Sequence, residues 1–206
     1  MNEEYYVLEE GEKTGPFSFD ELIKRGLDVD TPVLIPLADT WQNASYLPEF
    51  NEYFEANGYY FPTEDNLADF GWRALAFMTD YILISVLAIL IDLQLGWIAL
   101  PAKPTFNTLP QRTMMIVEIS FAVLFLIYNG LFEATATRGS LGKKLFNLKV
   151  VDEDGRQLTF LKAIARNFGA LLSFMLYGLP FLTLFLSEHK QTWYDRLAKT
   201  YTIRSS

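Results

Sequence analysis

Three long apolar runs dominate the C-terminal two-thirds of the chain. The first two cover residues 72–93 and 113–132. Each holds the roughly 20 predominantly apolar residues that an α-helix needs to cross a bilayer. The third, residues 164–187, is also long enough but is interrupted by Tyr-Gly-Leu-Pro at 177–180. The pattern predicts an all-α transmembrane domain with two plain spans and a third, interrupted segment.

The first 54 residues alternate polar and apolar positions over much shorter distances. Residues 5–8 and 31–35 read as short strands. Between them, Ser-Phe-Asp-Glu at 18–21 has the spacing of a capping box, in which the serine caps a helix and the glutamate reaches back to the serine amide. We therefore predict a small α/β domain with a helix over 19–25 that stops at Gly26. Its core is expected to close with Trp41, Tyr46, Leu47 and Phe50.

Basic residues predict the orientation of the spans. The linker over 133–166 carries seven Lys and Arg residues, whereas the loop over 94–112, which is rich in turn residues, carries only Lys103 and Arg112. Cytoplasmic loops of membrane proteins carry the excess of Lys and Arg. The linker is therefore predicted inside and the loop outside, with the N-terminus in the cytoplasm.

The third apolar run allows two topologies. A single straight crossing would place its C-terminal flank outside, and this flank is basic: Lys190, Arg196, Lys199 and Arg204. A broken, re-entrant hairpin would keep both flanks inside, where the charge bias favours them. In that case residues 199–204, which read as a strand, could pair with residues 148–151. Residues 145–151 and 157–160 are also predicted to form a local β-hairpin around the turn Asp-Glu-Asp-Gly at 152–155.

Charge marks the boundary between the two parts. Residues 1–66 hold 15 acidic and 3 basic residues, a net charge of −12, and residues 67–206 hold 10 acidic and 14 basic residues, a net charge of +4; together these give the −8 of the chain. We predict a domain over 1–57, a linker over 58–66 and a membrane domain over 67–206. The acidic N-terminus has no pattern of a cleavable signal. A multi-pass protein of a cell inner membrane is expected.

The N-terminal part resembles the GYF-like domains that often precede bacterial membrane segments. The positions that carry the resemblance are Tyr5, Tyr6, Gly15, Pro16, Phe17, Leu22, Gly26, Val33 and Trp41. The resemblance implies a surface for a proline-containing segment of a protein partner, formed by Tyr6, Gly15, Pro16, Phe17 and Trp41. The alternative is that Tyr5, Tyr6, Phe17 and Trp41 simply form the core of the domain.

The C-terminal part resembles the RDD family of bacterial membrane proteins. Three motifs carry the resemblance: Gly-Trp-Arg through Asp at 71–80, Ser-Leu-Gly-Lys-Lys through Gly at 140–155, and Trp-Tyr-Asp-Arg-Leu-Ala at 193–198. The family is named for one arginine and two aspartates, which map to Arg73, Asp80 and Asp195. The resemblance implies little about function, since most members are uncharacterised and some have been proposed to exchange Na⁺ for H⁺.

Polar residues in the spans predict an intramembrane cluster. Charges inside a bilayer persist when they pair or line a polar cavity. Helical spacing places Asn129 and Glu133 near the inner end of the second span, where Arg73 enters the first. The predicted cluster is Arg73, Asp80, Asn129, Glu133 and Asp195, with Arg73 paired to Asp69, Glu133 or Asp195.

Two functions fit this cluster. In one, the charges pair permanently and fix helix register, and the chain is a membrane-anchored adaptor. In the other, Asp80 has no permanent partner and binds H⁺ or Na⁺ alternately, which in so small a protein requires a homo-oligomer. Cysteine is absent and the one histidine, His189, lies in a polar flank, so no metal site and no cofactor is predicted. No sequence context suggests a nucleophile, and the basic residues lie beside the spans, so neither an enzyme nor a nucleic-acid-binding protein is expected.

Overall fold

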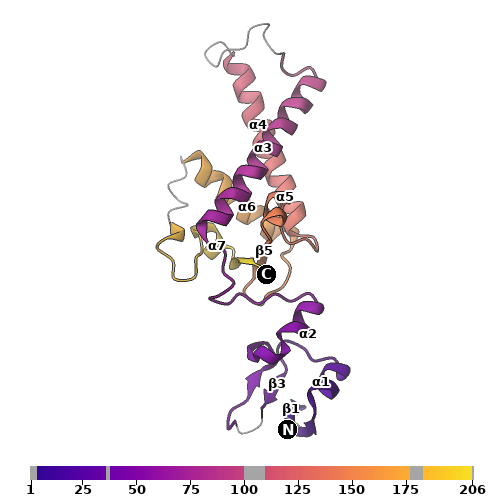
Figure 1. The fold of residues 1–206 in the computed structure, drawn as a ribbon. Helices are drawn as coiled ribbons and strands as arrows, with labels where there is room; N and C mark the ends of the chain where they lie inside the picture. The colour runs from indigo at the N-terminus through magenta and orange to yellow at the C-terminus, as the bar shows by residue number, and fades with distance from the viewer. Residues whose placement is uncertain (1–3, 36–37, 100–109, 177–182, 206) are drawn as a thin grey trace. The chain divides into compact units, whose positions relative to one another are not determined.

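The chain folds as two compact units, Met1–Phe61 and Pro62–Ser206. The structure is a computed structural model and describes residues 4–35, 38–99, 110–176 and 183–205; the ribbon is drawn in Figure 1. The division falls within the 58–66 segment that the charge pattern marked as a linker. Tyr59 and Phe61 pack against the buried Phe54, so the first unit extends beyond its predicted end at residue 57.

The first unit contains a four-stranded antiparallel sheet in the order β2-β1-β3-β4. Its strands are β1 (Tyr5–Glu9), β2 (Glu12–Phe17), β3 (Pro32–Leu34) and β4 (Gln42–Asn43). The sequence had indicated β1 and β3 but not their two edge partners. Side chains alternate between the faces of a strand, and Tyr5, Val7 and Val33 point to the buried face.

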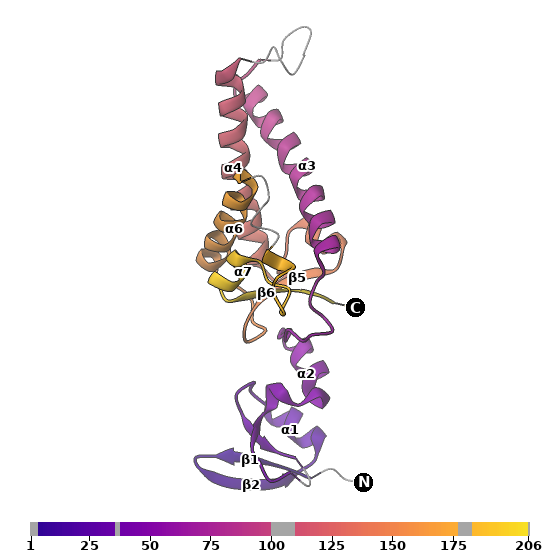
Figure 2. The ribbon, with the colours of Figure 1, turned by 90° about the vertical axis from the view of Figure 1, so that its left-hand side faces the viewer.

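Helices cover that buried face of the sheet, as Figure 2 shows. Helix α1 (Phe19–Arg25) has the predicted capping box between Ser18 and Glu21 and ends at Gly26 with a φ of 82°. Two short 3₁₀ helices, η1 (Ala44–Tyr46) and η2 (Pro48–Phe50), lead into α2 (Asn51–Ala56).

The core of the first unit differs in part from the prediction. Leu47 and Phe50 are buried in it, as expected. Trp41 and Tyr46 are not, because they remain 37% and 75% exposed. The core closes instead with Leu22 from α1 and Phe54 from α2.

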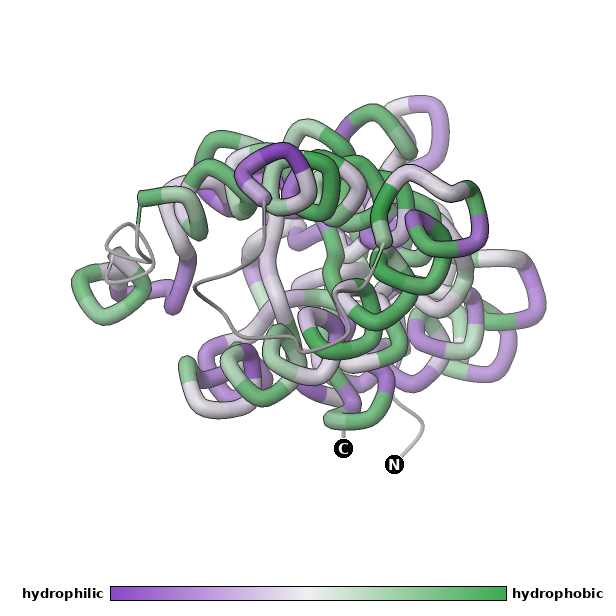
Figure 3. The backbone as a smooth tube through the Cα atoms, turned by 90° about the horizontal axis from the view of Figure 1, so that it is seen from above, coloured by the Kyte–Doolittle hydropathy of each residue, from purple (hydrophilic) through white to green (hydrophobic). Residues whose placement is uncertain are grey.

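The second unit is built on two long helices, α3 (Phe70–Gln94) and α4 (Gln111–Glu133), which cross in Figure 1. Both are long and apolar enough to cross a membrane, and only 22% of the apolar window of α3 and 17% of that of α4 is buried in the protein. Their outward faces are therefore rich in exposed aliphatic side chains. In Figure 3, which colours the backbone by hydropathy, hydrophobic positions recur along the helical turns.

The remaining elements close one end of this unit. They are α5 (Leu141–Leu145), β5 (Leu148–Asp152), α6 (Phe160–Met175), α7 (Trp193–Leu197) and β6 (Thr200–Arg204). Strand β5 pairs antiparallel with β6, which confirms the long-range pairing. The predicted local hairpin is wrong: the turn over 152–155 is present, but residues 157–159 are not a strand, and α6 starts at Phe160.

The last strand also joins the start of the second unit. The amide of Ala68 donates to the carbonyl of Thr202 at 2.9 Å, and the amide of Arg204 donates to the carbonyl of Asn66 at 2.7 Å. Arg166, near the start of the third apolar run, donates to the Thr202 hydroxyl of β6 at 3.2 Å, and Gln191, just after the run, donates to the Thr200 carbonyl at 2.9 Å. The predicted interruption of the run at 177–180 lies outside the described residues, as does most of the turn-rich loop over 94–112.

Candidate functional site

A buried cluster of charges joins five helices of the second unit, α3 to α7, with Asp195 of α7 near its centre. The carboxylate of Asp195 is fully buried and accepts a hydrogen bond from Nη2 of Arg73 on α3. It also accepts a hydrogen bond from Nε of Arg166 on α6 at 2.8 Å and lies 2.7 Å from Nη2 of the same guanidinium in an ion pair. Arg73 thus pairs with Asp195, one of the three partners predicted for it. Arg166 is a second partner of Asp195 that the sequence did not indicate.

Local structure fixes the carboxylate between these arginines. Thr192 and Asp195 form a capping box at the start of α7, in which Asp195 accepts from the Thr192 amide at 3.1 Å. Helix α7 packs closely against α6 at Gly169, which has no side chain. A Cβ at this position would lie only 2.5 Å from Cβ of Tyr194. The carboxylate therefore has little freedom to turn away.

Glu133, at the end of α4, forms the second half of the cluster. It is fully buried and pairs with Nζ of Lys143 and with Nη1 of Arg166, the latter at 2.8 Å. Its second oxygen accepts from the side-chain amide of Asn167 at 2.8 Å. Arg166 thus bridges the two carboxylates, and the backbone carbonyl of Lys190 accepts from Arg73 at 3.0 Å.

The electrostatics favour an ionised and fixed cluster. Burial alone would raise the pKa of Asp195, but Arg166 and Arg73 outweigh burial and hold this pKa well below its usual range. Three cations, Arg73, Lys143 and Arg166, face two carboxylates, and each oxygen of these carboxylates has a donor. Buried charges are tolerated when they are paired and hydrogen-bonded in this way.

Asp80 lies apart from this cluster and holds the start of α5, between α4 and β5. One oxygen accepts from the Tyr128 hydroxyl at 2.9 Å and from the Gly142 amide at 2.8 Å, and the other accepts from the Ser140 hydroxyl. A Cβ on Gly142 would lie 2.3 Å from the carbonyl oxygen of Ala76, so only glycine permits this close approach. Among the described residues, none of the ion pairs involves Asp80, and its three donors are neutral.

Asn129 is buried but bonds to neither carboxylate of the cluster. Its side-chain amide donates to the Phe125 carbonyl one turn earlier at 3.0 Å. The structure thus brings Arg73, Glu133 and Asp195 into one network and leaves Asp80 and Asn129 beside it. The sequence placed Lys143 in the second RDD motif and both Lys143 and Arg166 in the basic linker, but it did not indicate that either joins the cluster. The helical spacing of Arg166 could have indicated that it is buried, because it lies on the same face of α6 as the buried Ala163, Asn167 and Ala170.

A cavity of about 940 Å³ lies between α3, α4 and α6. One end is polar and is lined by members of the cluster, including Arg73, Lys143 and Arg166, with Asp80 and Asn129 beside them. The other end is lined mainly by aromatic and aliphatic side chains of the three helices. The volume is in the range of small-molecule sites. Among the described residues, no group of three or more His, Asp or Glu side chains is placed to hold a metal ion.

A further acidic residue, which the sequence analysis did not single out, lies near the far end of α3. Asp92 is fully buried, and one of its oxygens accepts from the Ser120 hydroxyl of α4 at 2.7 Å. Its other oxygen has no hydrogen-bond partner among the described residues. Asp92 and Asp80 share the buried face of α3 with Ile84 and Ala88 between them.

The outer face of the N-terminal sheet presents a second candidate site. Tyr6 lies opposite Leu34 across the β1–β3 pair, and Val33 pairs with Gln42. Trp41 directly precedes Gln42 in the chain and is 37% exposed.

The other predicted partner-binding residues divide between the two faces of this sheet. Gly15 lies against Tyr6, because an added Cβ would be 3.0 Å from its ring, and Pro16 is exposed beside it. Phe17 pairs with Tyr5 in the sheet and, partly buried, packs against the core. The reading in which Trp41 belongs to the core is wrong, since Trp41 is exposed.

Comparisons with known proteins agree with the two-unit organisation. The family model described as RDD family matches residues 67–199, and the one described as GYF domain 2 matches residues 5–50. A protein of Bacillus subtilis (strain 168), described as uncharacterized protein YxaI, is 30% identical over 149 residues, which cover 66% of this chain and 96% of that protein. No solved structure matches the chain.

Proposed function

The chain belongs to the RDD family, and on that premise we propose that it is a membrane-anchored binding module whose GYF-like unit captures a protein partner. The observation that carries the proposal is the exposed Trp41, which directly precedes β4 in the sheet that also contains Tyr6. Trp41 is 37% exposed and contributes nothing to the core. Exposed aromatic side chains on a rigid sheet are typical of recognition surfaces.

The charge cluster of the second unit supports an anchoring role. Its carboxylates and cations are bonded to one another, and Asp80 accepts three hydrogen bonds. A site that alternates between two ions needs a group whose partners change, whereas this network consists of fixed pairs. The proposal therefore assigns the cluster to helix register and assigns no catalytic step to the chain.

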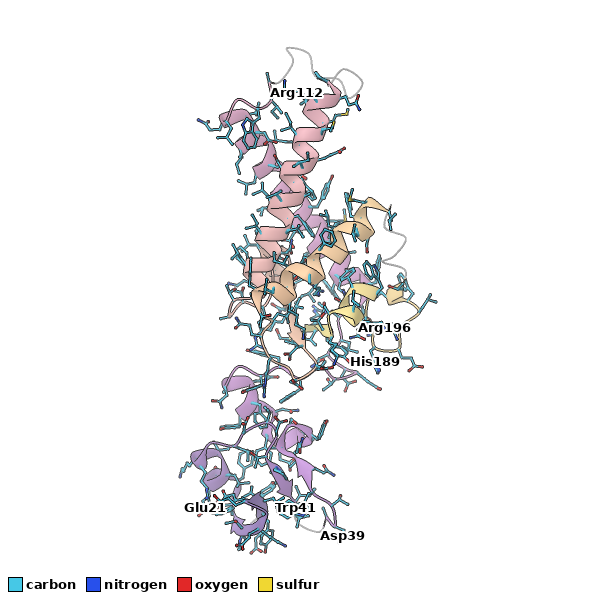
Figure 4. All side chains as sticks on the ribbon, turned by 180° about the vertical axis from the view of Figure 1, so that it is seen from behind. Glu21, Asp39, Trp41, Arg112, His189 and Arg196 are labelled. Atoms are coloured by element: carbon cyan, nitrogen blue, oxygen red, sulfur yellow. The ribbon has the colours of Figure 1, made fainter. Side chains whose placement is uncertain are left out.

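The proposed anchor is the pair of helices α3 and α4, which cross the cell inner membrane. Figure 4 places Arg112 at one end of the second unit and His189 and Arg196 toward the other. The second end carries the basic linker and the basic C-terminal flank. The positive-inside rule then puts this end, and with it the N-terminal unit, in the cytoplasm. The third run returns to this side without crossing.

The proposed partner presents an extended, proline-containing segment with basic residues near it. Proline-rich segments keep a preformed extended helix that docks on aromatic surfaces at low entropic cost. The first 66 residues carry a net charge of −12 (3 basic against 15 acidic residues). Such a field attracts a basic partner and accelerates association at low ionic strength.

Binding of synthetic peptides to the full-length protein in nanodiscs tests this proposal. Isothermal titration with proline-containing peptides, each with basic or neutral flanks, should find a peptide whose affinity falls at least tenfold in the Trp41→Ala variant. Tyr46→Ala is the matched control, because Tyr46 is a 75% exposed aromatic residue of η1. The proposal is wrong if no peptide binds, or if both variants lose affinity equally.

The topology can be tested separately, because the chain contains no cysteine. Single cysteines at Thr113, near the start of α4, and at Glu188, an exposed residue of the basic end, give two clean reporters. A membrane-impermeant maleimide should label Thr113→Cys in intact cells and Glu188→Cys only after permeabilisation. The reverse pattern, or labelling of both from outside, would overturn the orientation.

A cation/proton antiporter is the second candidate, and the cavity lined by Asp80 and Asn129 is the observation in its favour. Two crossing helices per chain would require a homo-oligomer to form a path. The test is Na⁺-driven proton movement in everted vesicles, with wild type and Asp80→Asn at matched levels. Exchange that is lost in Asp80→Asn would support transport, and no exchange above empty vesicles would leave the binding module as the function.

A further inference from the structure

The apolar end of the cavity between α3, α4 and α6 has an aromatic wall made by all three helices. Phe77 and Tyr81 of α3, Phe121 of α4 and Phe174 of α6 contact one another, with ring centroids 5.1 to 6.4 Å apart. Phe174 is 40% exposed and Tyr81 38% exposed, so these rings present surface to the cavity that they line.

One carboxylate stands beside this wall. Glu118 precedes Phe121 by three residues on α4, so the two side chains lie on one face of the helix. Both line the cavity, together with Ser85 of α3. Glu118 is exposed to the cavity, and no hydrogen bond or ion pair with another described residue satisfies it. It lies seven residues into α4, about 10 Å from the helix start.

A carboxylate at this depth needs a counter-charge. Acidic residues within membrane helices are costly and typically pair with another group or with a ligand. The cations that line the same cavity, Arg73, Lys143 and Arg166, are at its polar end and already pair with Glu133 and Asp195. Glu118 is thus the charged group of the apolar end.

From this arrangement we infer that the cavity binds a bulky lipophilic cation, such as an organic quaternary ammonium or phosphonium ion. The faces of the aromatic rings attract a cation through their quadrupoles, and Glu118 supplies the opposite charge in a medium of low dielectric. The three cations at the polar end repel a positive ligand and confine it to the aromatic end. The cavity volume of about 940 Å³ accommodates a ligand with several apolar substituents.

Direct binding of tritium-labelled tetraphenylphosphonium to the purified full-length protein in detergent tests this inference. We expect saturable binding that weakens at least tenfold in Glu118→Gln, which corresponds to about 1.4 kcal/mol. Phe121→Leu, which keeps the volume apolar but removes a ring, should also weaken binding. Glu188→Gln is the matched control, because Glu188 is an exposed acidic residue that does not line the cavity.

Charge selectivity is tested with tetraphenylsilane, a neutral molecule of the same shape, as competitor. It should displace the labelled cation poorly from wild type. Equal displacement would show that the cavity selects bulk alone, and unchanged affinity in Glu118→Gln would remove the carboxylate from the site; either result overturns the inference. Thermal unfolding of each variant shows whether lost binding reflects lost folding. The assay needs neither the proposed topology nor a peptide partner, so it can fail independently of them.

Discussion

Neutralising Asp195 should be among the most damaging single substitutions in the second unit. In Asp195→Asn the shape is kept, but the buried cluster retains the cations Arg73, Arg166 and Lys143 against Glu133 alone. The carboxylate contacts both arginines at hydrogen-bond distance. At an effective dielectric constant of about 20, each close pair is worth roughly 4 kcal/mol before desolvation is counted. The new amide would also direct N–H groups toward guanidinium donors.

The net effect follows from the burial of the pair. Removing one partner of a buried ion pair costs about 3–5 kcal/mol, because the remaining charge is left uncompensated. A unit of this size loses about 2–4 °C in Tm for each kcal/mol. We therefore expect Asp195→Asn to lower the Tm of the detergent-solubilised protein by about 6–20 °C, measured by the loss of near-ultraviolet circular dichroism.

The pair between Lys190 and Asp69 provides the matched control. Nζ of Lys190 lies 2.6 Å from Oδ1 of Asp69, but the two side chains are 38% and 67% exposed. Exposed pairs contribute about 0–1 kcal/mol, so Asp69→Asn should shift the Tm by no more than about 4 °C. Equal shifts in the two variants would refute the argument that burial decides the cost.

A double substitution sharpens the test. Arg73→Met in the Asp195→Asn background removes one of the uncompensated cations, so the two substitutions together should cost less than their sum, with a coupling of about 0.5–3 kcal/mol. Strictly additive effects would mean that Arg73 and Asp195 do not interact in solution.

Three further predictions concern the same unit. Gly142→Ala should lower the Tm by several degrees, because overpacking typically costs about 1–3 kcal/mol, while Gly71→Ala, where an added Cβ meets nothing within 4 Å, should leave the Tm unchanged or raise it slightly. The pKa of Asp195 in the folded protein is below its ordinary value. The ionised carboxylate therefore stabilises the fold fully above about pH 4, and this stabilisation is lost as the pH falls toward the folded pKa. When Tm is measured against pH, Asp195→Asn should lack this loss at acid pH. Ser120→Ala should lower the Tm, because it leaves both carboxylate oxygens of the buried Asp92 without a hydrogen-bond donor, at a cost of about 1–3 kcal/mol. An unchanged Tm would mean that Asp92 has another hydrogen-bond donor.

Features encoded by neighbouring residues could be predicted from the sequence. The capping box of Ser18 and Glu21 and the two long helices depend on spacing and hydrophobic period, and the structure contains them. The requirement that a charge in a span has a partner gave three candidates for Arg73, namely Asp69, Glu133 and Asp195, and Arg73 pairs with Asp195. Each of these inferences needed only one element or one constraint.

Features that depend on distant segments could not be read in the same way. Residues 145–160 carry the local pattern of a hairpin, but β5 pairs with β6, whose sequence lies some 50 residues further on. Arg166 was counted as a topology signal because nothing near it in sequence is acidic, whereas its partners Glu133 and Asp195 come from other helices. Trp41 looked like a core residue because aromatic character alone does not indicate which face of a sheet it occupies.

The position of β6 has a consequence for biosynthesis. Residues 200–204 complete the small sheet and bond to the start of the second unit through Asn66 and Ala68. Asp195 also follows all three cations of the cluster in the sequence, so it is synthesised after them. Asp195 and residues 200–204 therefore leave the ribosome after α3 and α4. The two long apolar helices exist for a time without the residues that complete one end of the unit, and deletion of residues 200–204 would leave this incomplete intermediate open to quality-control proteases.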